Sequence, residues 1–295
     1  MAQSPAHKLG QIIGDVLESA VEPLLRKFAR SHKLYLDCNG LRPARTGKKV
    51  SWKDQSGNVH DLDYVLERDG TATRIGVPAA FIETAWRRYT KHSRNKAQEI
   101  QGAILPLAAT YRAAAPFIGV ILAGVFTDGA LDQLRSQGFA VLYFPYESVI
   151  DAFRKAGVDF SFEEDTAETV LAAKVDTWER LSAVQRAKVA KRLLAVNAPD
   201  LQQFMDSLDR CVSRTLSSVR VIPLHGVVVE LNSAQDAIGF ISAYTESDAA
   251  LPLCRYEIEI LYSNGDNIRA EFHAKETAIE FLAGYAPPAL GSPLT

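Results

Sequence analysis

The sequence predicts an α/β fold in which a mixed central sheet is flanked by helices. Strand-like segments alternate with segments of helical periodicity over the first 155 residues, and this alternation is typical of α/β proteins. The most apolar segment, 117–126, fits a buried strand. Beyond residue 217 the pattern becomes strand-like again, which predicts a second and smaller α+β module.

The first part of the predicted core is a helix followed by three strands. Apolar residues at helical spacing predict a helix over 8–31, and LYLDCNG predicts a short strand and turn before the basic loop 41–49. The segment 50–67 predicts a β-hairpin around Ser56-Gly57-Asn58. Asp69-Gly70 predicts a tight turn into the next strand, VPAAFIETAW.

The second part of the predicted core alternates helix and strand. Ser93 or Asn95 caps a helix, Asp128 begins another, and Gly138 closes it. The expected order is helix, strand, helix, strand and helix, at 93–114, 117–126, 128–137, 139–144 and 147–155.

Changes of pattern divide the chain into three predicted regions. The acidic segment 160–166 ends a core at 1–160, and helical periodicity over 161–216 predicts a connector. Residues 217–295 contain strand patterns and an Asn264-Gly265 hairpin signal, without catalytic residues of their own. We therefore expect this module to serve target recognition or the formation of a homodimer.

The composition is that of a soluble globular protein, with 47% hydrophobic residues, 23% charged residues and a net charge of −2. The cysteines Cys38, Cys211 and Cys254 are widely spaced and odd in number, which favours free thiols in a reducing cytoplasm. No run of 18 apolar residues and no signal-peptide core occurs. We expect a cytoplasmic protein without a membrane partner.

Two of the predicted strands carry acids where a buried sheet should carry apolar residues. Asp61 and Asp63 share one face of the first strand, and Glu83 lies near the end of the second. A hairpin would bring Asp63 and Glu83 side by side. Two adjacent carboxylates repel each other unless a cation lies between them, and hard oxygen ligands select Mg²⁺ or Mn²⁺. The pair therefore predicts a Mg²⁺ site, with Mn²⁺ as the other candidate metal.

A dense basic segment follows Glu83 directly. A carboxylate metal site beside clustered Arg and Lys indicates metal-assisted attack on a phosphodiester. We expect contacts to the phosphates of double-stranded DNA from Arg87, Arg88, Arg94 and Lys96.

These features resemble the PD-(D/E)XK nuclease superfamily, which includes most type II restriction endonucleases and many phage-defence nucleases. The resemblance covers about residues 10–155 and consists of an aspartate in a strand, Asp63, a glutamate about twenty residues later, Glu83, an amphipathic helix after it, and the order of the elements. It implies a restriction-endonuclease-like core, Asp63 and Glu83 as metal ligands and catalytic residues, and Mg²⁺-dependent DNA endonuclease activity in restriction or phage defence.

The sequence departs from the family pattern at two positions. The lysine position is Ala85, and the residue before Asp63 is Leu62 rather than proline. Lys91 and Lys96 then compete for the role of the lysine, and Lys91 is the predicted catalytic residue. Two alternatives stay open, namely a catalytically silent nuclease-fold subunit that binds DNA or a partner protein, and a nuclease that acts on RNA.

Several polar residues near the predicted site are candidates for accessory roles. Acids on the first helix are candidate extra ligands to the metal or to water, and residues on the helix after the basic segment are candidates to support the attacking water. For each of them an ordinary surface role is the alternative. The candidates are Glu18, Glu22, Asp61, Gln98 and Glu99.

Overall fold

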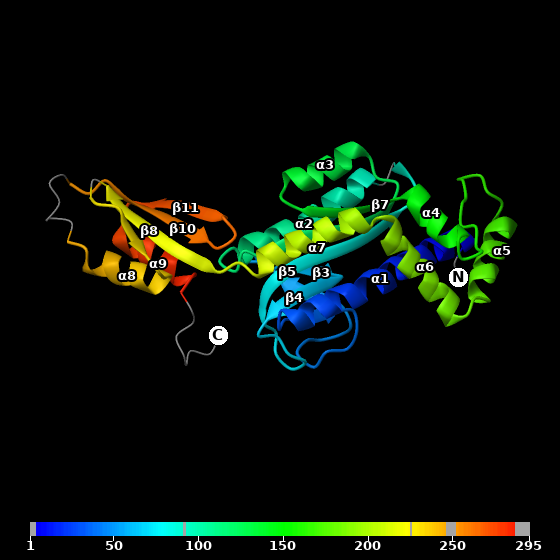
Figure 1. The fold of residues 1–295 in the computed structure, drawn as a ribbon, viewed down its shortest axis with the longest axis horizontal. Helices are drawn as coiled ribbons and strands as arrows, with labels where there is room; N and C mark the ends of the chain where they lie inside the picture. The colour runs from blue at the N-terminus through cyan, green and yellow to red at the C-terminus, as the bar shows by residue number, and fades with distance from the viewer. Residues whose placement is uncertain (1–3, 91–92, 225, 246–251, 287–295) are drawn as a thin grey trace. The chain divides into compact units, whose positions relative to one another are not determined.

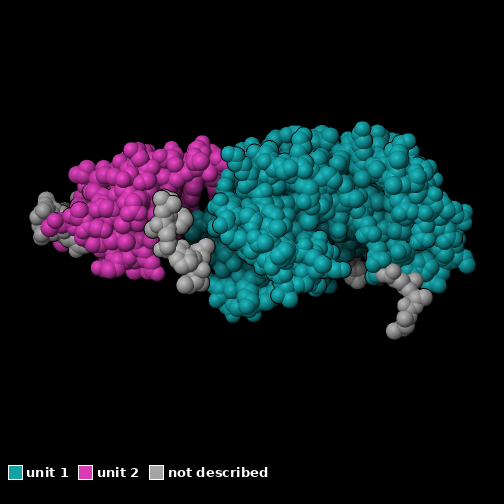
Figure 2. Space-filling model, turned by 90° about the horizontal axis from the view of Figure 1, so that it is seen from below, with its two compact units in different colours: residues 1–212 teal, residues 213–295 magenta. Residues whose placement is uncertain are grey.

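The computed structural model of the chain describes residues 4–90, 93–224, 226–245 and 252–286. The chain forms two compact units, residues 1–212 and 213–295 (Figure 2). Unit 1 is an α/β structure with a mixed central sheet flanked by helices, as predicted (Figure 1).

The central sheet of unit 1 has the strand order β1-β4-β5-β6-β7. Neighbouring strands β1, β4 and β5 pair antiparallel, whereas β5, β6 and β7 pair parallel. Strand β5, which carries Glu83, therefore joins the antiparallel part of the sheet to the parallel part. The strands are Tyr35–Cys38 (β1), Tyr64–Arg68 (β4), Val77–Arg87 (β5), Phe117–Gly124 (β6) and Ala140–Pro145 (β7).

Helices cover both faces of this sheet (Figure 1). Alternate residues of β5 enter two cores: Ile82 packs with α1 and α4, whereas Phe81 and Ala85 pack with α2 and α3. This alternation follows from the two-residue period of a strand. The helices are Pro5–Ser31 (α1), Ser93–Thr110 (α2), Asp128–Ser136 (α3) and Tyr146–Arg154 (α4).

The segment 161–216 is not a separate connector. Its helices are Glu168–Glu179 (α5), Ala183–Val196 (α6) and Ala198–Val212 (α7), and they belong to unit 1. Their apolar faces join the core that contains α1, and the Trp178 ring lies 5.2 Å from the Phe153 ring of α4. Burial of these faces explains why the helices fold onto the sheet instead of standing apart from it.

The segment predicted as one acidic strand is split in two. Strands β2 (Val50–Lys53) and β3 (Val59–Leu62) form the predicted hairpin, and β4 then joins the central sheet. Asp63 is the bend between β3 and β4.

The predicted tight turn at Asp69-Gly70 is wrong, because residues 69–76 form a longer connection between β4 and β5. The buried Glu67 holds this connection in place. Its carboxylate accepts a hydrogen bond from the Gly76 N–H (2.7 Å) and forms an ion pair with Arg42 (2.6 Å). A two-residue turn would not place the Gly76 N–H beside the Glu67 carboxylate.

Unit 2 is a small α+β module with an antiparallel sheet of order β11-β10-β8-β9. Helices α8 (Ala234–Ala243) and α9 (Lys275–Ala283) pack on one face of it. No helix in the described part of the chain is long and apolar enough to cross a membrane. The strands are Leu216–Leu224 (β8), Val229–Leu231 (β9), Arg255–Tyr262 (β10) and Asn267–Phe272 (β11).

Candidate functional site

The structure brings Asp63 and Glu83 together. The β4–β5 register, with Tyr64 opposite Ile82, brings the Asp63 bend beside Glu83. The Asp63 backbone N–H donates to Glu83 Oε1 at 3.2 Å. Thr84 donates to Asp63 Oδ2 from both its backbone N–H and its hydroxyl, each at 2.7 Å. Thr84 therefore fixes the orientation of the Asp63 carboxylate, a role that the sequence pattern did not indicate.

Glu83 lies in a position that disfavours its negative charge. It is only 8% exposed. Burial, and then the charge of Asp63, raise the pKa of Glu83 to about 8, while the charge of Lys96 opposes this increase. Near neutral pH the Glu83 carboxyl group therefore keeps a proton that an added cation can displace.

Glu18 of α1 is a third acid in the same electrostatic environment. Partial burial of its carboxyl group, followed by the charges of Asp63, Asp15 and Glu22, raises the pKa of Glu18 to about 7. No ion pair to Glu18 occurs among the described residues. The negative charges of the acids on α1, at the β3–β4 bend and on β5 therefore repel one another, and too few cations of the described chain lie among them to balance these charges.

The donor chemistry of this pair fits a hard divalent cation. Mg²⁺ is commonly held by one or two carboxylates, and waters and substrate phosphates complete its coordination. Asp63 and Glu83 provide two such carboxylates. Over the residues that the structure describes, no three His, Cys, Asp or Glu side chains form a prearranged ligand set.

Among the described residues, Lys96 is the cation whose charge affects Glu83. It lies in the first turns of α2, its side chain is largely buried, and it forms an ion pair with Glu99 at 3.3 Å. Its charge lowers the pKa of Glu83. Ala85, two residues after Glu83, is buried in the core next to α2. Lys91, the predicted catalytic lysine, lies outside the described residues.

The two arginines after β5 differ in what they contact. Arg88 donates from Nε to the Phe162 carbonyl (2.9 Å), pairs with Glu163 (2.9 Å), and stacks 4.0 Å above the Tyr146 ring. Only 12% of its side chain is exposed. Arg87 is more exposed and lies 4.0 Å from Glu99. The structure therefore gives Arg88 a packing role and leaves Arg87 as the better candidate for a phosphate contact.

This difference predicts different effects on stability. Arg88→Ala should lower the free energy of unfolding by about 1–3 kcal/mol, because the Phe162 carbonyl loses a charged donor. Arg87→Ala should change it by less than about 0.5 kcal/mol. Urea unfolding followed by circular dichroism measures both. Equal losses in the two variants would contradict the assignment.

The remaining predicted site residues fall into two groups. Some acids already have a partner: Glu22 pairs with Arg26 (2.5 Å), and Asp61 accepts hydrogen bonds from Lys49 and Ser51 (2.6 Å each), which lower the pKa of Asp61. The others are exposed on α2, namely Arg94, Gln98 and Glu99, of which Glu99 pairs with Lys96.

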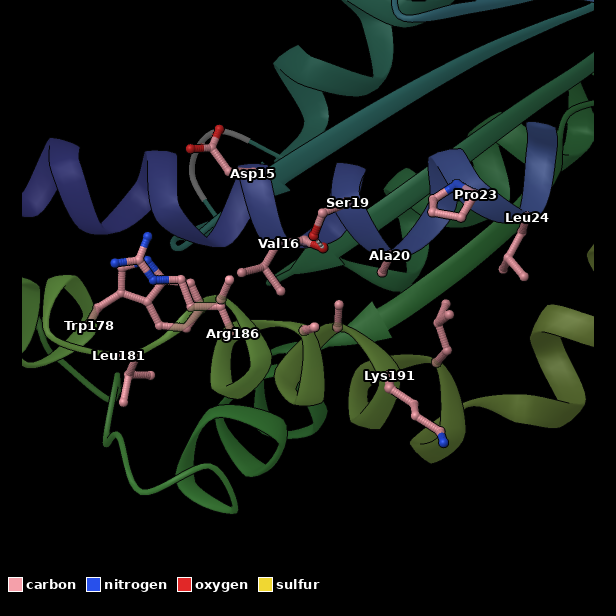
Figure 3. A pocket seen from close by; sticks show the side chains of 14 residues that line it. Asp15, Val16, Ser19, Ala20, Pro23, Leu24, Trp178, Leu181, Arg186 and Lys191 are labelled. Atoms are coloured by element: carbon pink, nitrogen blue, oxygen red, sulfur yellow. Dashed lines mark hydrogen bonds between the residues drawn. The ribbon is translucent and has the colours of Figure 1, made fainter. Parts of the chain in front are cut away.

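A pocket of about 790 Å³ lies between α1 and the α5–α6 region of unit 1 (Figure 3). At one end of it the Arg186 guanidinium lies 5.5 Å from the Trp178 ring. None of Glu18, Asp63 and Glu83 lines this pocket, so it is distinct from the acidic site. Its apolar lining includes Val16, Ala20, Leu24, Leu181, Ala187 and Leu194.

Comparison with known proteins supports no particular function. No family model and no curated protein matches the chain. Among solved structures, the chain is similar to the crystal structure of a protein of unknown function, AF1548, at 9% identity and a TM-score of 0.27. That match covers 65% of this chain and 99% of the other. A likeness at this level says nothing about function.

Proposed function

We propose that the chain is a divalent-metal-dependent DNA endonuclease in which unit 1 is a PD-(D/E)XK-like, restriction-endonuclease-like core. The observation that carries this proposal is the Asp63–Glu83 pair, in which a buried glutamate with a pKa raised to about 8 lies beside a second carboxylate. The order helix, antiparallel strands, helix, strand, helix, strand in unit 1 supports it.

Each residue of the site has a distinct role in this proposal. Asp63 and Glu83 hold Mg²⁺ or Mn²⁺, and Thr84 orients Asp63 through its two hydrogen bonds. When bound, the ion supplies positive charge that stabilises the negative charge developing on the phosphodiester.

Lys96 and Glu18 supply the remaining chemistry of the proposed site. Lys96 adds a second positive charge beside the acids, where the phosphate charge increases during attack. Glu18 has a pKa of about 7, so its carboxylate can accept a proton from the attacking water near neutral pH.

The distribution of charge favours unit 1 as the part that contacts DNA. Residues 213–295 carry ten Asp and Glu side chains against five Arg and Lys. A surface with this excess of acid repels phosphates. Of the two roles expected for unit 2, dimerisation of the chain therefore fits better than target recognition. A restriction or phage-defence role for the resulting homodimer is part of this proposal.

A catalytically silent subunit is the second candidate. The observation that favours it is Ala85, which is buried at the position where the family carries its lysine.

Incubation of the full chain with supercoiled plasmid separates the two candidates. We expect nicked and linear DNA with Mg²⁺ or Mn²⁺ and none with EDTA. DNA binding without cleavage in either metal would establish the silent subunit. Cleavage of a structured RNA in place of DNA would identify an RNA nuclease.

Replacing Lys96 tests whether the lysine of the family has moved to α2. Lys96→Ala should slow Mg²⁺-dependent cleavage at least about tenfold, or about 1.4 kcal/mol in the barrier, because a positive charge beside the acids is lost. Lys188→Ala, an exposed lysine of α6, is the matched control and should cleave at the wild-type rate. Equal rates in both variants would exclude Lys96 from catalysis.

A further inference from the structure

Strand β11 is an edge of the sheet in unit 2. It comes first in the order β11-β10-β8-β9 and pairs with β10 (Figure 1). In the part of the chain that the structure describes, no strand pairs with its other side. An edge strand carries a row of backbone N–H and C=O groups that can pair with another strand, and a proline in the strand often prevents this. Asn267–Phe272 contains no proline.

The backbone groups that face this free edge belong to alternate residues. At the hairpin end, the Tyr262 N–H donates to the Asp266 carbonyl at 2.9 Å, so Asp266 directs its carbonyl to β10. Hydrogen-bonded and non-hydrogen-bonded pairs alternate along an antiparallel ladder. The even-numbered residues of β11 therefore direct their backbone groups to β10, whereas Arg269 and Glu271 direct theirs to the free edge.

The side chains of Arg269 and Glu271 make this edge self-complementary. They lie on one face, on either side of Ala270, and 77% and 61% of their side chains are exposed. If a second copy of β11 paired antiparallel about Ala270, the Arg269 of each copy would lie opposite the Glu271 of the other. These two residues would also exchange backbone hydrogen bonds, because their N–H and C=O groups face the free edge. Opposite charges directly across a sheet stabilise strand pairing, and like charges oppose it.

Both side chains already belong to a row of alternating charges within the sheet. Arg269 pairs with Glu259 at 2.8 Å, and Glu271 pairs with Arg255 at 3.3 Å. Pairing of two copies would therefore continue this row of charges from one sheet to the other.

The opposite face of this edge carries apolar side chains that are only partly buried. The rings of Phe272 and Phe281 lie 5.1 Å apart, and those of Phe281 and Tyr285 lie 5.0 Å apart. All three pack against the core of unit 2 without full burial, as does Ile268. Pairing about Ala270 would place the Phe272 of one copy opposite the Ile268 of the other. It would therefore cover apolar surface as well as backbone groups.

We propose that β11 is the surface through which the chain dimerises, and that it pairs antiparallel about Ala270 with the β11 of a second copy. This inference rests on the homodimer of the proposed function and names its interface. A two-fold pairing uses the same edge of both copies, so the assembly closes at two chains.

Charge reversals in the full chain test this pairing. Arg269→Glu and Glu271→Arg each place like charges opposite one another in a pair of identical copies. Each should raise the dissociation constant of the dimer at least about tenfold, measured by sedimentation velocity over a dilution series. A mixture of the two variants places positive side chains of one copy opposite negative side chains of the other, so it should recover the wild-type dissociation constant. A role confined to the fold of each copy would not be recovered by mixing.

Glu230→Arg is the matched control for Glu271→Arg. Glu230 belongs to β9, the other edge of the same sheet, is 54% exposed and pairs with Arg220 at 3.3 Å. This control should dimerise like the wild type, and circular dichroism checks the fold of every variant. Hydrogen exchange gives a second measurement without any substitution: the Arg269 and Glu271 amides should exchange more slowly in concentrated than in dilute wild-type protein.

The outcomes distinguish the β11 pairing from the nuclease function. Reversal variants that dimerise like the wild type, or that are monomeric and do not recover on mixing, would overturn the pairing alone. A wild-type chain that is monomeric at every concentration would overturn the pairing and the homodimer, while metal-dependent nicking of plasmid by that monomer would leave the nuclease proposal standing. Dimers that respond to the reversals and to mixing, but do not nick DNA, would support the pairing and overturn the nuclease.

Discussion

Asp63→Asn should lower the rate of Mg²⁺-dependent DNA cleavage at least about a thousandfold, or about 4 kcal/mol in the barrier. The substitution removes one of the two carboxylates that hold the cation in the proposed site, and it is the carboxylate that Thr84 orients. Glu83→Gln should have an effect of the same order. Single-turnover nicking of supercoiled plasmid, with enzyme in excess, measures these losses without interference from product release.

Matched variants separate this loss from a fold defect. Asparagine and glutamine preserve the volume of each side chain, and the Glu83 carboxyl group already accepts a hydrogen bond from the Asp63 backbone, which an amide oxygen can also accept. Asp61→Asn is the control at a nearby acid, because Asp61 pairs with Lys49 instead. If Asp61→Asn is as damaging as Asp63→Asn, the cation site is assigned to the wrong residues.

The stability of the metal-free protein should fall as the pH rises from about 5 to 8. Burial raises the pKa of Glu83 from its ordinary value of 4.5 to about 8 in the folded state. Between these values the unfolded chain has lost the Glu83 proton and the folded protein still holds it, so raising the pH favours unfolding. The contribution of Glu83 to the slope is at most about 1.4 kcal/mol per pH unit. Glu18 acts in the same direction up to about pH 7.

A divalent cation should reverse this trend. In the proposed site Mg²⁺ binds the ionised carboxylates of the folded state, so it should raise the melting temperature more at pH 8 than at pH 5. Glu83→Gln should be more stable than the wild type at pH 8 without metal, and should gain little from Mg²⁺. Thermal unfolding at pH 5, 6, 7, 8 and 9 with and without Mg²⁺ measures both effects. If the melting temperatures of the wild type and Glu83→Gln changed with pH in the same way, burial of the Glu83 carboxyl group would not be the cause of the trend.

Local patterns in the sequence were enough to predict much of unit 1. Apolar periodicity predicted α1, and the apolar run after residue 116 predicted β6. The alternation of acids along two strands predicted that Asp63 and Glu83 are neighbours, since a hairpin leaves few other registers. The hairpin of β2 and β3 followed from its Ser56-Gly57-Asn58 turn.

Features that depend on distant partners could not be predicted. Arg88 belongs to a basic run in sequence, but its partners Phe162 and Glu163 come about 74 residues later. The loop at 69–76 departs from a tight turn because Arg42, far earlier in the chain, pairs with the buried Glu67. The helical periodicity after residue 161 predicts helices but does not show which surface they pack against. In the structure their apolar faces pack in the same core as α1.

Binding of Mn²⁺ tests the central claim most directly, because it needs neither a substrate nor catalysis. Electron paramagnetic resonance of free Mn²⁺ at pH 8 should show that the wild-type chain binds the ion, and that the Asp63→Asn/Glu83→Gln double variant loses this binding while its circular dichroism spectrum is unchanged. Equal Mn²⁺ binding by the wild type and the double variant, or no binding by the wild type at millimolar Mn²⁺, would contradict the account.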